Sequence, residues 1–474
     1  MQESIPNPLE RNQRRYIPEP QMPVRVFPQE NLPSAESSKG HSNVGFALGL
    51  YFSIPFCRSK CTYYNFASGV YPASEHARYT ARLVDDLAAA PAFARQNSLT
   101  LPATVDTIYF GGGTPVLLEA EHFHSIFRSI REHFALTPDA EITVEAAPGQ
   151  ISDATLAAMV ENGVNRISFG VQSFIDKEAQ QSGRLHTRAI VLEDLRRLRA
   201  AGISNINLDL LAGLAGQTLD SWRESLSILI EIGVPHASIY MLEIDEDSRL
   251  GRELISGGVR YGAELVPSDD TIAQMYEEAV EILSSAGISQ YEISNFARPG
   301  FESRHNLRYW QRRAYLGLGL DASSMLYATD GTALRFTTTS DLSEYLDGSF
   351  EPTERSWLGP VQQLEEAWFL GLRRNAGVSL NGLEAEFGAE AIAPTIDVAE
   401  RLAADGLLHI ELHPAKRRKP AQRKTGQGIR SEVSPEVPDR IVRLTPRGRL
   451  ISNDLFAEFL GLAPTPELAS SRHA

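Results

Sequence analysis

Two thiols give this chain its clearest potential for metal chemistry. Cys57 and Cys61 are its only cysteines, and they lie in the segment Ser53-Ile-Pro-Phe-Cys-Arg-Ser-Lys-Cys-Thr-Tyr-Tyr-Asn-Phe66. Thiolates are the usual ligands of iron–sulfur clusters, so a Cys-x3-Cys spacing can form part of a cluster loop. A further thiol would complete a Cys-x3-Cys-x2-Cys pattern, but Tyr64 occupies that position. The segment therefore has the form of a metal loop in which a phenol replaces one ligand.

Other polar and glycine-rich segments follow the predicted strands. They are Gly111–Pro115, Glu145–Gly149, Gly170–Ser173, Gly183–Thr187, and Asp209 with Gly213–Thr218. Taken singly, each has a simpler interpretation as a tight turn, a helix cap or a surface ion pair. The carboxyl ends of parallel strands meet at one edge of a sheet, so segments in these positions face one another. Their common position favours a shared binding site.

Short apolar segments alternate with helical segments and predict an α/β fold. The strand candidates are Ala47–Ile54, Val105–Phe110, Glu141–Glu145, Asn165–Phe169, Asn205–Leu210, Ala237–Leu242 and Tyr291–Ile293. Gly163, Gly202, Gly233 and Gly287 stand between helix and strand, where a left-handed glycine can end a helix. This repeat implies parallel strands with right-handed crossovers, and the apolar strands predict a sheet covered on both faces. We expect a full or partial α/β barrel, with a doubly wound open sheet as the alternative.

The two ends of the chain differ from this pattern. Residues 1–44 are rich in proline and polar side chains and are predicted to be disordered. The segments Leu364–Arg374 and Ile392–Asp405 are predicted helices, and Leu407–Leu412 and Ile441–Thr445 are predicted strands. They indicate a small winged-helix-like domain that serves as a packing or partner surface. The basic segment 413–438 is interpreted as an exposed loop, in preference to a site for nucleic acid or an acidic partner.

The composition limits the function classes. The chain is 42% hydrophobic and 22% charged, as expected of a globular protein with a sizeable core. No apolar segment approaches the roughly 18 residues of a membrane helix, and the N-terminus lacks a signal-peptide pattern. Two cysteines in 474 residues argue against a disulfide framework and favour the cytoplasm. A net charge of −15 disfavours nonspecific binding to nucleic acid.

The order of these motifs, from about Leu50 to Phe459, resembles the radical S-adenosylmethionine (SAM) family. Its most similar branch contains oxygen-independent coproporphyrinogen III oxidases and HemW-type heme chaperones. The resemblance implies a partial parallel (β/α) barrel with its extension at 45–350 and a HemN-C-like domain at 355–465. It also implies a [4Fe–4S] cluster and SAM as cofactors. Cys57 and Cys61 would be cluster ligands. The SAM site would contain Tyr51, Tyr63, Gly112, Gly113, Thr114, Glu145, Gln172, Arg184 and Asp209.

The residue types suit those roles. Arg184 can bind a carboxylate through two hydrogen bonds. Gln172 and the acidic side chains suit ribose hydroxyls or an ammonium group. Exposed backbone N–H groups near Gly113 would suit polar cofactor atoms.

Two features favour the heme-chaperone branch. The oxidases carry another cysteine where this chain has Phe66. The chaperones carry a His-Asn-x-x-Tyr-Trp motif, and this chain reads His305-Asn-Leu-Arg-Tyr309-Trp310. A neutral imidazole is a good axial heme ligand, and aromatic rings can stack on a porphyrin, so His305 is the expected heme ligand. A buried histidine in an aromatic core cluster is the alternative.

The chain also departs from the family pattern. Ala147, Ala215 and Ser323 replace an asparagine, a proline and a histidine, and these changes are tolerable. Tyr64 is more serious, because a phenol is a hard oxygen donor with a reference pKa near 10. We expect a cluster that is absent, substoichiometric or quickly lost, and radical chemistry that fails with it. A point mutation or sequence error and a natural loss both remain open.

Three functions are therefore compared. The first is a cytoplasmic heme chaperone whose partners are heme and an acceptor protein, with peripheral association at membrane-bound acceptors as a further expectation. The second is an enzyme, a radical SAM coproporphyrinogen III oxidase. The third is a degenerate, non-catalytic scaffold that binds a partner. No nucleic-acid partner is expected.

Overall fold

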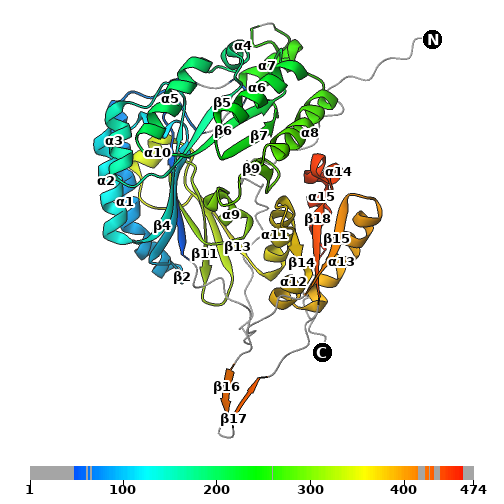
Figure 1. Ribbon diagram of the computed structural model, residues 1–474. Coiled ribbons are helices and arrows are strands. Elements are labelled where there is room, and N and C mark those ends of the chain that lie inside the picture. Colours follow the sequence, from blue (N-terminus) through cyan, green and yellow to red (C-terminus); the bar gives the residue numbers. More distant parts are fainter. Residues whose placement is uncertain are drawn as a thin grey trace, which may run out of the picture.

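A long curved sheet dominates the structure, and a smaller unit of helices and strands lies beside it (Figure 1). The structure, a computed structural model, describes residues 47–59, 62–63, 67–258, 260–414, 422–425, 428–431 and 438–462. The expectations for residues 1–44, for Cys61, Tyr64 and Phe66, and for most of 413–438 lie outside these residues.

The centre of the sheet is a run of neighbouring parallel strands. In spatial order they are β10 (Tyr315–Gly319), β1 (Leu48–Ile54), β3 (Thr104–Gly112), β4 (Ala135–Ala146), β5 (Arg166–Gln172), β6 (Asn205–Ala212) and β7 (His236–Met241). Antiparallel strands extend both ends: β11 (Ser323–Ala328), β12 (Ala333–Thr337) and β13 (Glu354–Leu358), with β2 (Leu99–Thr100) on β11, and β9 (Asn295–Ala297) and β8 (Ser289–Gln290). The pairing runs as an open path from β13 to β8, so the predicted partial parallel barrel is confirmed.

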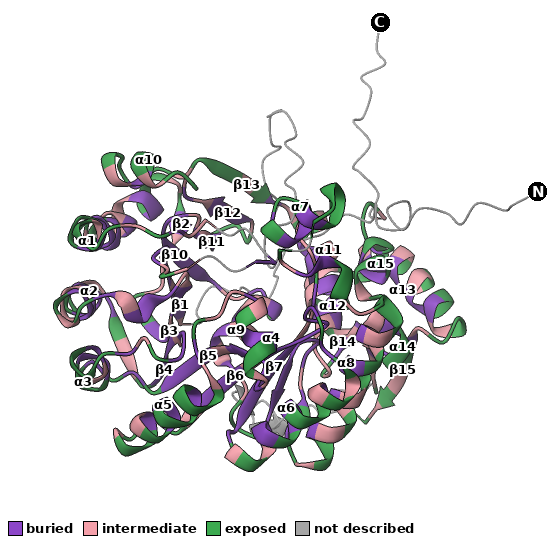
Figure 2. Cartoon of the chain, turned by 90° about the horizontal axis from the view of Figure 1, so that it is seen from above, coloured by how far each residue is buried: buried purple, intermediate pink, exposed green. Residues whose placement is uncertain are grey.

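Helices cover the outer side of this curved wall, as Figure 2 shows. They include α1 (Ser74–Gln96), α2 (Ala120–His133), α3 (Asp153–Glu161), α5 (Arg188–Ala200), α6 (Leu219–Ile232) and α8 (Asp269–Ser285). Shorter segments join them: the helices α4 (Asp176–Gln181), α7 (Arg249–Ser256) and α10 (Leu342–Asp347), and the 3-10 turns Pro115–Leu117 and Ala263–Leu265. The glycines predicted to end helices all have positive φ, from +70° at Gly233 to +92° at Gly202. Such angles favour glycine, so the helix–glycine–strand prediction is confirmed.

The inner face of β4 to β7 differs from the sequence-based expectation of apolar strands on both faces. Arg166, Ser168, Asn207 and Ser238 are buried there, and they line one small polar cavity. The opposite face carries buried apolar side chains such as Phe169. Successive side chains of a strand point to opposite faces, so polar and apolar residues can alternate within one strand. Both faces of these strands are therefore buried, but one of them is polar, because the partial barrel surrounds a polar interior.

The short helix α9 (Arg304–Trp310) lies across the amino ends of β1 and β3 and contacts the middle of β4 at Glu141. The buried Arg308 donates hydrogen bonds to the carbonyls of Ala47 and Ala314, both at 2.8 Å, and forms an ion pair with Asp106. Burial lowers the pKa of Arg308 to about 10, although Asp106 opposes that shift. The carboxylate of Glu141 accepts hydrogen bonds from the first backbone N–H groups of α9, at 3.1 and 3.0 Å. These contacts fix the helix against the sheet.

The C-terminal unit has its own core around the buried Trp368. Its helices are α11 (Pro360–Arg373), α12 (Leu380–Phe387), α13 (Ala389–Ala404), α14 (Pro446–Leu450) and α15 (Ser452–Ala457). A three-stranded antiparallel sheet has the order β14 (Val378–Ser379), β18 (Asp439–Leu444) and β15 (Leu408–His413). The expected helices and strand pair are therefore present.

Two local predictions were wrong. Tyr291–Ile293 is not a strand, because its residues form the turn between β8 and β9, where the backbone N–H of Tyr291 bonds the carbonyl of Asn295. The 413–438 segment is not entirely a loop, because β16 (Gln422–Thr425) and β17 (Gly428–Ser431) form an antiparallel hairpin. This hairpin stands away from the rest of the protein (Figure 1).

We predict that Arg308→Met destabilises the protein strongly. The substitution leaves the backbone carbonyls of Ala47 and Ala314 without this donor and removes a buried ion pair. Breaking such a pair costs about 3–5 kcal/mol of the free energy of unfolding, which urea denaturation measures. Arg304→Met is the matched control, since Arg304 pairs with the exposed Asp139 and should cost at most about 1 kcal/mol. Equal losses in both variants would contradict the anchoring role.

Candidate cofactor site at the carboxyl ends of the strands

The glycine turn after β3 packs directly against the cysteine loop. The backbone N–H of Gly113 donates to the carbonyl of Ile54 at 2.8 Å, and that of Thr114 donates to Phe56 at 2.7 Å. The Thr114 hydroxyl lies 3.9 Å from the sulfur of Cys57. A Cβ atom on Gly113 would lie 2.8 Å from the carbonyl oxygens of Ile54 and Phe56, too close for any side chain. Glycine is therefore required here by the close approach of two backbone segments.

This packing corrects one expectation about the glycine turn. Exposed N–H groups near Gly113 were expected to face the cofactor, but those of Gly113 and Thr114 bond within the protein. The backbone of Gly112, at φ +98°, hydrogen-bonds the carboxylate of Glu145. The turn therefore seats the cysteine loop and positions an acidic side chain.

Glu145 is half-buried near the carboxyl end of β4. The hydroxyl of Tyr109 donates to its Oε1 at 2.8 Å. Burial raises the pKa of Glu145 to about 7, the Tyr109 hydrogen bond lowers it, and the charge of Asp209 raises it again. Burial also raises the pKa of Asp209, whose Oδ1 accepts a hydrogen bond from Asn207 at 2.7 Å. Two carboxyl groups thus interact across β4 to β6 with their charged forms disfavoured.

Arg184 and Gln172 lie next to these acids. A Cβ atom added to Gly170 would lie 3.0 Å from one guanidinium nitrogen of Arg184 and 3.1 Å from Nε2 of Gln172. Gly170 is aligned with Asp209 on the neighbouring strand. The charge of Arg184 lowers the pKa values of both Glu145 and Asp209. Gln172 has φ +68°, an uncommon conformation for a residue other than glycine that often marks a functional site.

The remaining predicted residues take different positions. Tyr51 on β1 stacks on Tyr109, with ring centroids 6.1 Å apart, and therefore borders the Glu145 side. Tyr63 is buried in a separate cluster beyond β6 and β7 that includes Leu214 and Leu242. The structure thus brings Glu145, Gln172, Arg184 and Asp209 together, and it places Gly112, Gly113 and Thr114 beside Cys57.

These residues fit SAM well. SAM is cationic at its sulfonium and ammonium groups and anionic at its carboxylate. Glu145 and Asp209 would gain from a nearby cation, because their charged forms are poorly solvated. Arg184 can bind the carboxylate. The fit to a [4Fe–4S] cluster is poorer, because Cys57 and Cys61 are the only thiols in the chain.

His305 lies inside the barrel, below these acids, and is 1% exposed. Its Nδ1 lies 2.9 Å from the Thr107 hydroxyl, and its Nε2 lies 2.8 Å from the Tyr309 hydroxyl. The ring stacks on Tyr109, with centroids 5.2 Å apart. In this conformation both ring nitrogens are engaged, so His305 presents no accessible nitrogen to heme iron.

The other aromatic residues of the hexapeptide are also engaged. Trp310 lies under the guanidinium of Arg373 from α11, 4.3 Å from the ring centroid. Tyr309 packs edge-on against Tyr315, with centroids 4.6 Å apart. The expected stacking of these rings on a porphyrin would require a rearranged segment. Here Trp310 joins the barrel to α11 of the C-terminal unit, and Tyr309 packs within the barrel.

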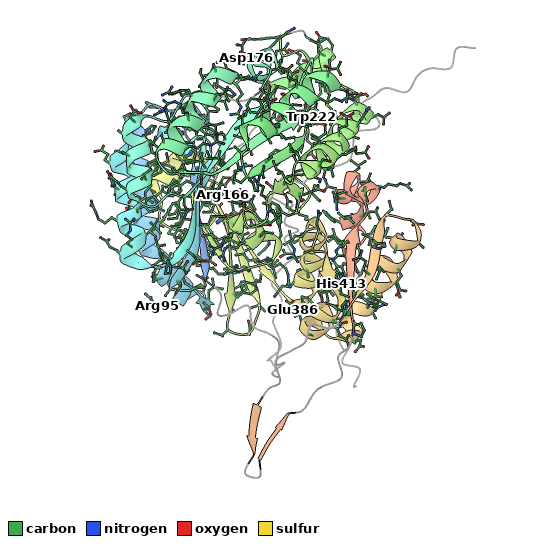
Figure 3. The ribbon with its side chains drawn as sticks, in the orientation of Figure 1. Arg95, Arg166, Asp176, Trp222, Glu386 and His413 are labelled. Carbon is green, nitrogen blue, oxygen red and sulfur yellow. The ribbon has the colours of Figure 1, made fainter. Side chains whose placement is uncertain are left out.

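The sequence analysis missed the polar interior of the barrel. Arg166, labelled in Figure 3, borders a cavity of about 50 Å³ together with Asn207 and His236. The Nδ1 atom of His236 lies 2.6 Å from Oδ1 of Asn207, and its Nε2 lies 2.9 Å from the Tyr291 hydroxyl. The signal was available, because polar residues recur at every second position of β5, β6 and β7. Such alternation marks one face of a strand.

We predict that Glu145→Gln changes the pH dependence of stability. A pKa raised from 4.5 to about 7 makes the protonated carboxyl favourable for folding. That stabilisation is complete below pH 4.5 and is lost as the pH rises through 7, a change of about 3 kcal/mol. Urea unfolding should therefore show the stability of wild type minus Glu145→Gln falling by that amount between pH 4.5 and 7.5. Glu193→Gln is the control, since the pKa of Glu193 is lowered and its difference should stay flat. A flat difference for Glu145→Gln would contradict the burial of this acid.

Comparison with known proteins identifies the family of this chain. The sequence profile described as the Radical SAM superfamily matches residues 51–229. A Lactococcus lactis protein named heme chaperone HemW is 34% identical over 341 residues, which cover 71% of this chain and 84% of that protein. The Bacillus subtilis protein of the same name is 31% identical over 416 residues, covering 87% and 98%.

A solved structure agrees on the fold. The coproporphyrinogen III oxidase HemN of Escherichia coli superposes with a TM-score of 0.69, over 87% of this chain and 90% of that one. Its identity of 21% supports the fold alone. The profile match and the HemW relatives decide the family. The chain therefore belongs to the radical SAM superfamily and, within it, to the HemW family.

Proposed function

We propose that this protein is a heme chaperone that binds heme and transfers it to an acceptor protein. The observation that carries the proposal is the similarity to proteins named heme chaperone HemW, which extends over 84% and 98% of two such proteins. Two cysteines in the whole chain suit a reducing compartment, and we assign the protein to the cytoplasm. In the part of the chain that the structure describes, no helix has the length and apolar character to cross a bilayer. Membrane-bound acceptors would therefore be reached at the membrane surface.

The axial ligand is a separate question. His305 is the ligand that the family motif indicates. To reach iron, its imidazole would have to leave the hydrogen bonds to Thr107 and Tyr309. Buried hydroxyls left without partners cost about 1–3 kcal/mol each. Ligation by His305 therefore requires a rearrangement of α9 that heme binding would have to drive.

Superfamily membership implies a [4Fe–4S] cluster and SAM. We propose that Glu145, Gln172, Arg184 and Asp209 bind SAM in the arrangement described above, beside Tyr51 and the glycine turn. The proposed cluster ligands are Cys57 and Cys61. With Tyr64 in place of a third cysteine, we propose that the cluster is incomplete or unstable and that the chaperone works without radical chemistry.

The oxidase alternative draws on one observation, the fold shared with HemN. Phe66, where the oxidases have a cysteine, counts against it. Porphyrin formed from coproporphyrinogen III in an anaerobic assay with SAM and a reductant would favour this alternative. A protein that binds neither iron nor heme would instead be the degenerate scaffold.

Hemin titration tests the proposed function. We expect the full chain to bind one heme, with a Soret band displaced from that of free hemin. Because a chaperone must release its cargo, heme should then pass to apomyoglobin, an acceptor with a buried high-affinity site. Stopped-flow absorbance measures the transfer. Absence of heme binding, or heme that cannot be transferred, would contradict the chaperone proposal.

Anaerobic reconstitution tests the effect of Tyr64. We expect wild type to retain fewer than the four irons of a complete cluster, and Tyr64→Cys to approach four with matching sulfide, since thiolates are the preferred ligands. Asn65→Cys is the matched control, because it also supplies a third thiol but at the wrong spacing. Iron and sulfide assays and SAM cleavage are the measurements. A wild-type protein that holds four irons and cleaves SAM would overturn the two-thiolate argument.

A further inference from the structure

Accessible imidazoles are few in the described part of this chain. The histidines that are buried, each less than 10% exposed, are His76, His122, His186, His236 and His305. Three others have side chains at least 40% exposed: His124 at 40%, His409 at 63% and His413 at 45%. A chaperone exchanges its heme with another protein, so an iron ligand at the surface suits it better than one in the core. The exposed histidines are therefore the candidates.

Two of these histidines share one face of β15. His409, Glu411 and His413 occupy alternate positions, so their side chains point the same way. Nε2 of His409 lies 3.3 Å from one carboxylate oxygen of Glu411, and Nε2 of His413 lies 3.1 Å from the other. On the opposite face of the strand, Leu408 packs into the core of the C-terminal unit. The histidine face is thus the solvent side of the small sheet, where Figure 3 labels His413.

The neighbouring strand adds a cation to this face. Arg443 of β18 is aligned with His409, and Ile441 is aligned with Glu411. The guanidinium of Arg443 pairs with Glu411, and its Nη2 lies 3.2 Å from Nε2 of His413. The face therefore combines two imidazoles, an arginine and the half-buried Ile441 with two carboxylates, Glu411 and Asp439, of which Asp439 is aligned with His413.

We infer that this β15 face, formed by His409, His413 and Arg443, is a heme-binding surface. The inference rests on the proposed chaperone function and gives it a site. One imidazole nitrogen binds the iron, Arg443 exchanges its contact with Glu411 for one with a propionate carboxylate, and Ile441 contacts the macrocycle edge. The second imidazole serves as an alternative ligand, which suits a cargo that must leave.

The composition of the cluster favours heme over a bare metal ion. Among the described residues, no three His, Cys, Asp or Glu side chains are arranged to hold a metal ion. A porphyrin already supplies four nitrogen ligands, so heme iron needs only one imidazole from the protein. The rearrangement is also small, because both imidazoles are exposed and water can replace their contacts with Glu411. If His305 moved to bind iron, in contrast, the buried hydroxyls of Thr107 and Tyr309 would each lose a hydrogen-bond partner.

The test is hemin titration of the full chain, followed by the Soret band. His409→Ala/His413→Ala should bind hemin with an affinity at least about tenfold lower and lose the spectrum of imidazole-ligated heme. Each single variant should bind more tightly than the double variant, because either imidazole can ligate. His124→Ala is the matched control, since His124 is an exposed histidine with a glutamate, Glu161, at 3.6 Å. It should behave as wild type, and His305→Ala should keep its heme.

The other outcomes separate the possibilities. A double variant that binds like wild type, while His305→Ala loses heme, overturns this surface and leaves the chaperone function intact. A wild-type chain that binds no hemin overturns both. Several hemes per chain, with His124→Ala equally affected, would mean nonspecific binding to surface histidines and would also overturn the proposal. His409→Gln/His413→Gln, compared by circular dichroism, detects a folding defect in the alanine variant, because glutamine keeps the polar face without an imidazole.

Discussion

The anchoring of α9 to β1, β3 and β4 is the constraint on which the rest of the structure depends. Arg308 is enclosed by Asp106 and by the carbonyls of Ala47 and Ala314, and these groups come from three separate parts of the chain. Glu141 fixes the first turn of the same helix through two backbone N–H groups. Because a buried guanidinium needs all its partners, the helix has little freedom to shift. The helix thereby covers part of the amino-terminal side of the barrel, opposite the strand ends that carry Glu145 and Asp209.

Burial in the barrel also shifts the pKa values of the acidic side chains in its interior. The barrel encloses polar side chains away from water, so Glu145 and Asp209 lose much of the solvation that favours their charged forms. The positive charge of Arg184 lowers the pKa values of both acids, but it offsets only part of the effect of burial. A cationic ligand at the open end would lower the energy of this arrangement, which is why the site suits SAM whether or not a complete cluster can form beside it. The residues proposed to bind SAM are therefore distinct from the cysteines proposed to bind the cluster.

Local sequence patterns predicted much of the fold and the grouping of the candidate site residues. The helix–glycine–strand units follow from backbone preferences that a short segment reveals, and the polar residues at successive strand ends identified Glu145, Gln172, Arg184 and Asp209 together. What the sequence could not reveal were contacts between distant residues. Arg308 meets Asp106 across 202 positions, and His305 meets Thr107 across 198. A histidine in a family motif has the same one-letter code whether it is buried or exposed. Whether its ring nitrogens are accessible to a metal depends on tertiary packing, which a local sequence pattern does not predict.

The packing of the hexapeptide bears on where heme can bind. His305, Arg308 and Trp310 belong to one short helix, and each makes a different contact. His305 stacks on Tyr109 inside the barrel, Arg308 pairs with Asp106, and Trp310 packs under Arg373 of α11. Moving His305 far enough to bind iron would disturb the other two, because a helix of this length moves largely as a unit. Heme ligation by His305 would therefore disturb the contact of Trp310 with Arg373 in the C-terminal unit. A ligand on the outer face of β15 has no such conflict, since that face can bind and release heme without a change in the barrel, in the junction or in the site at the open end.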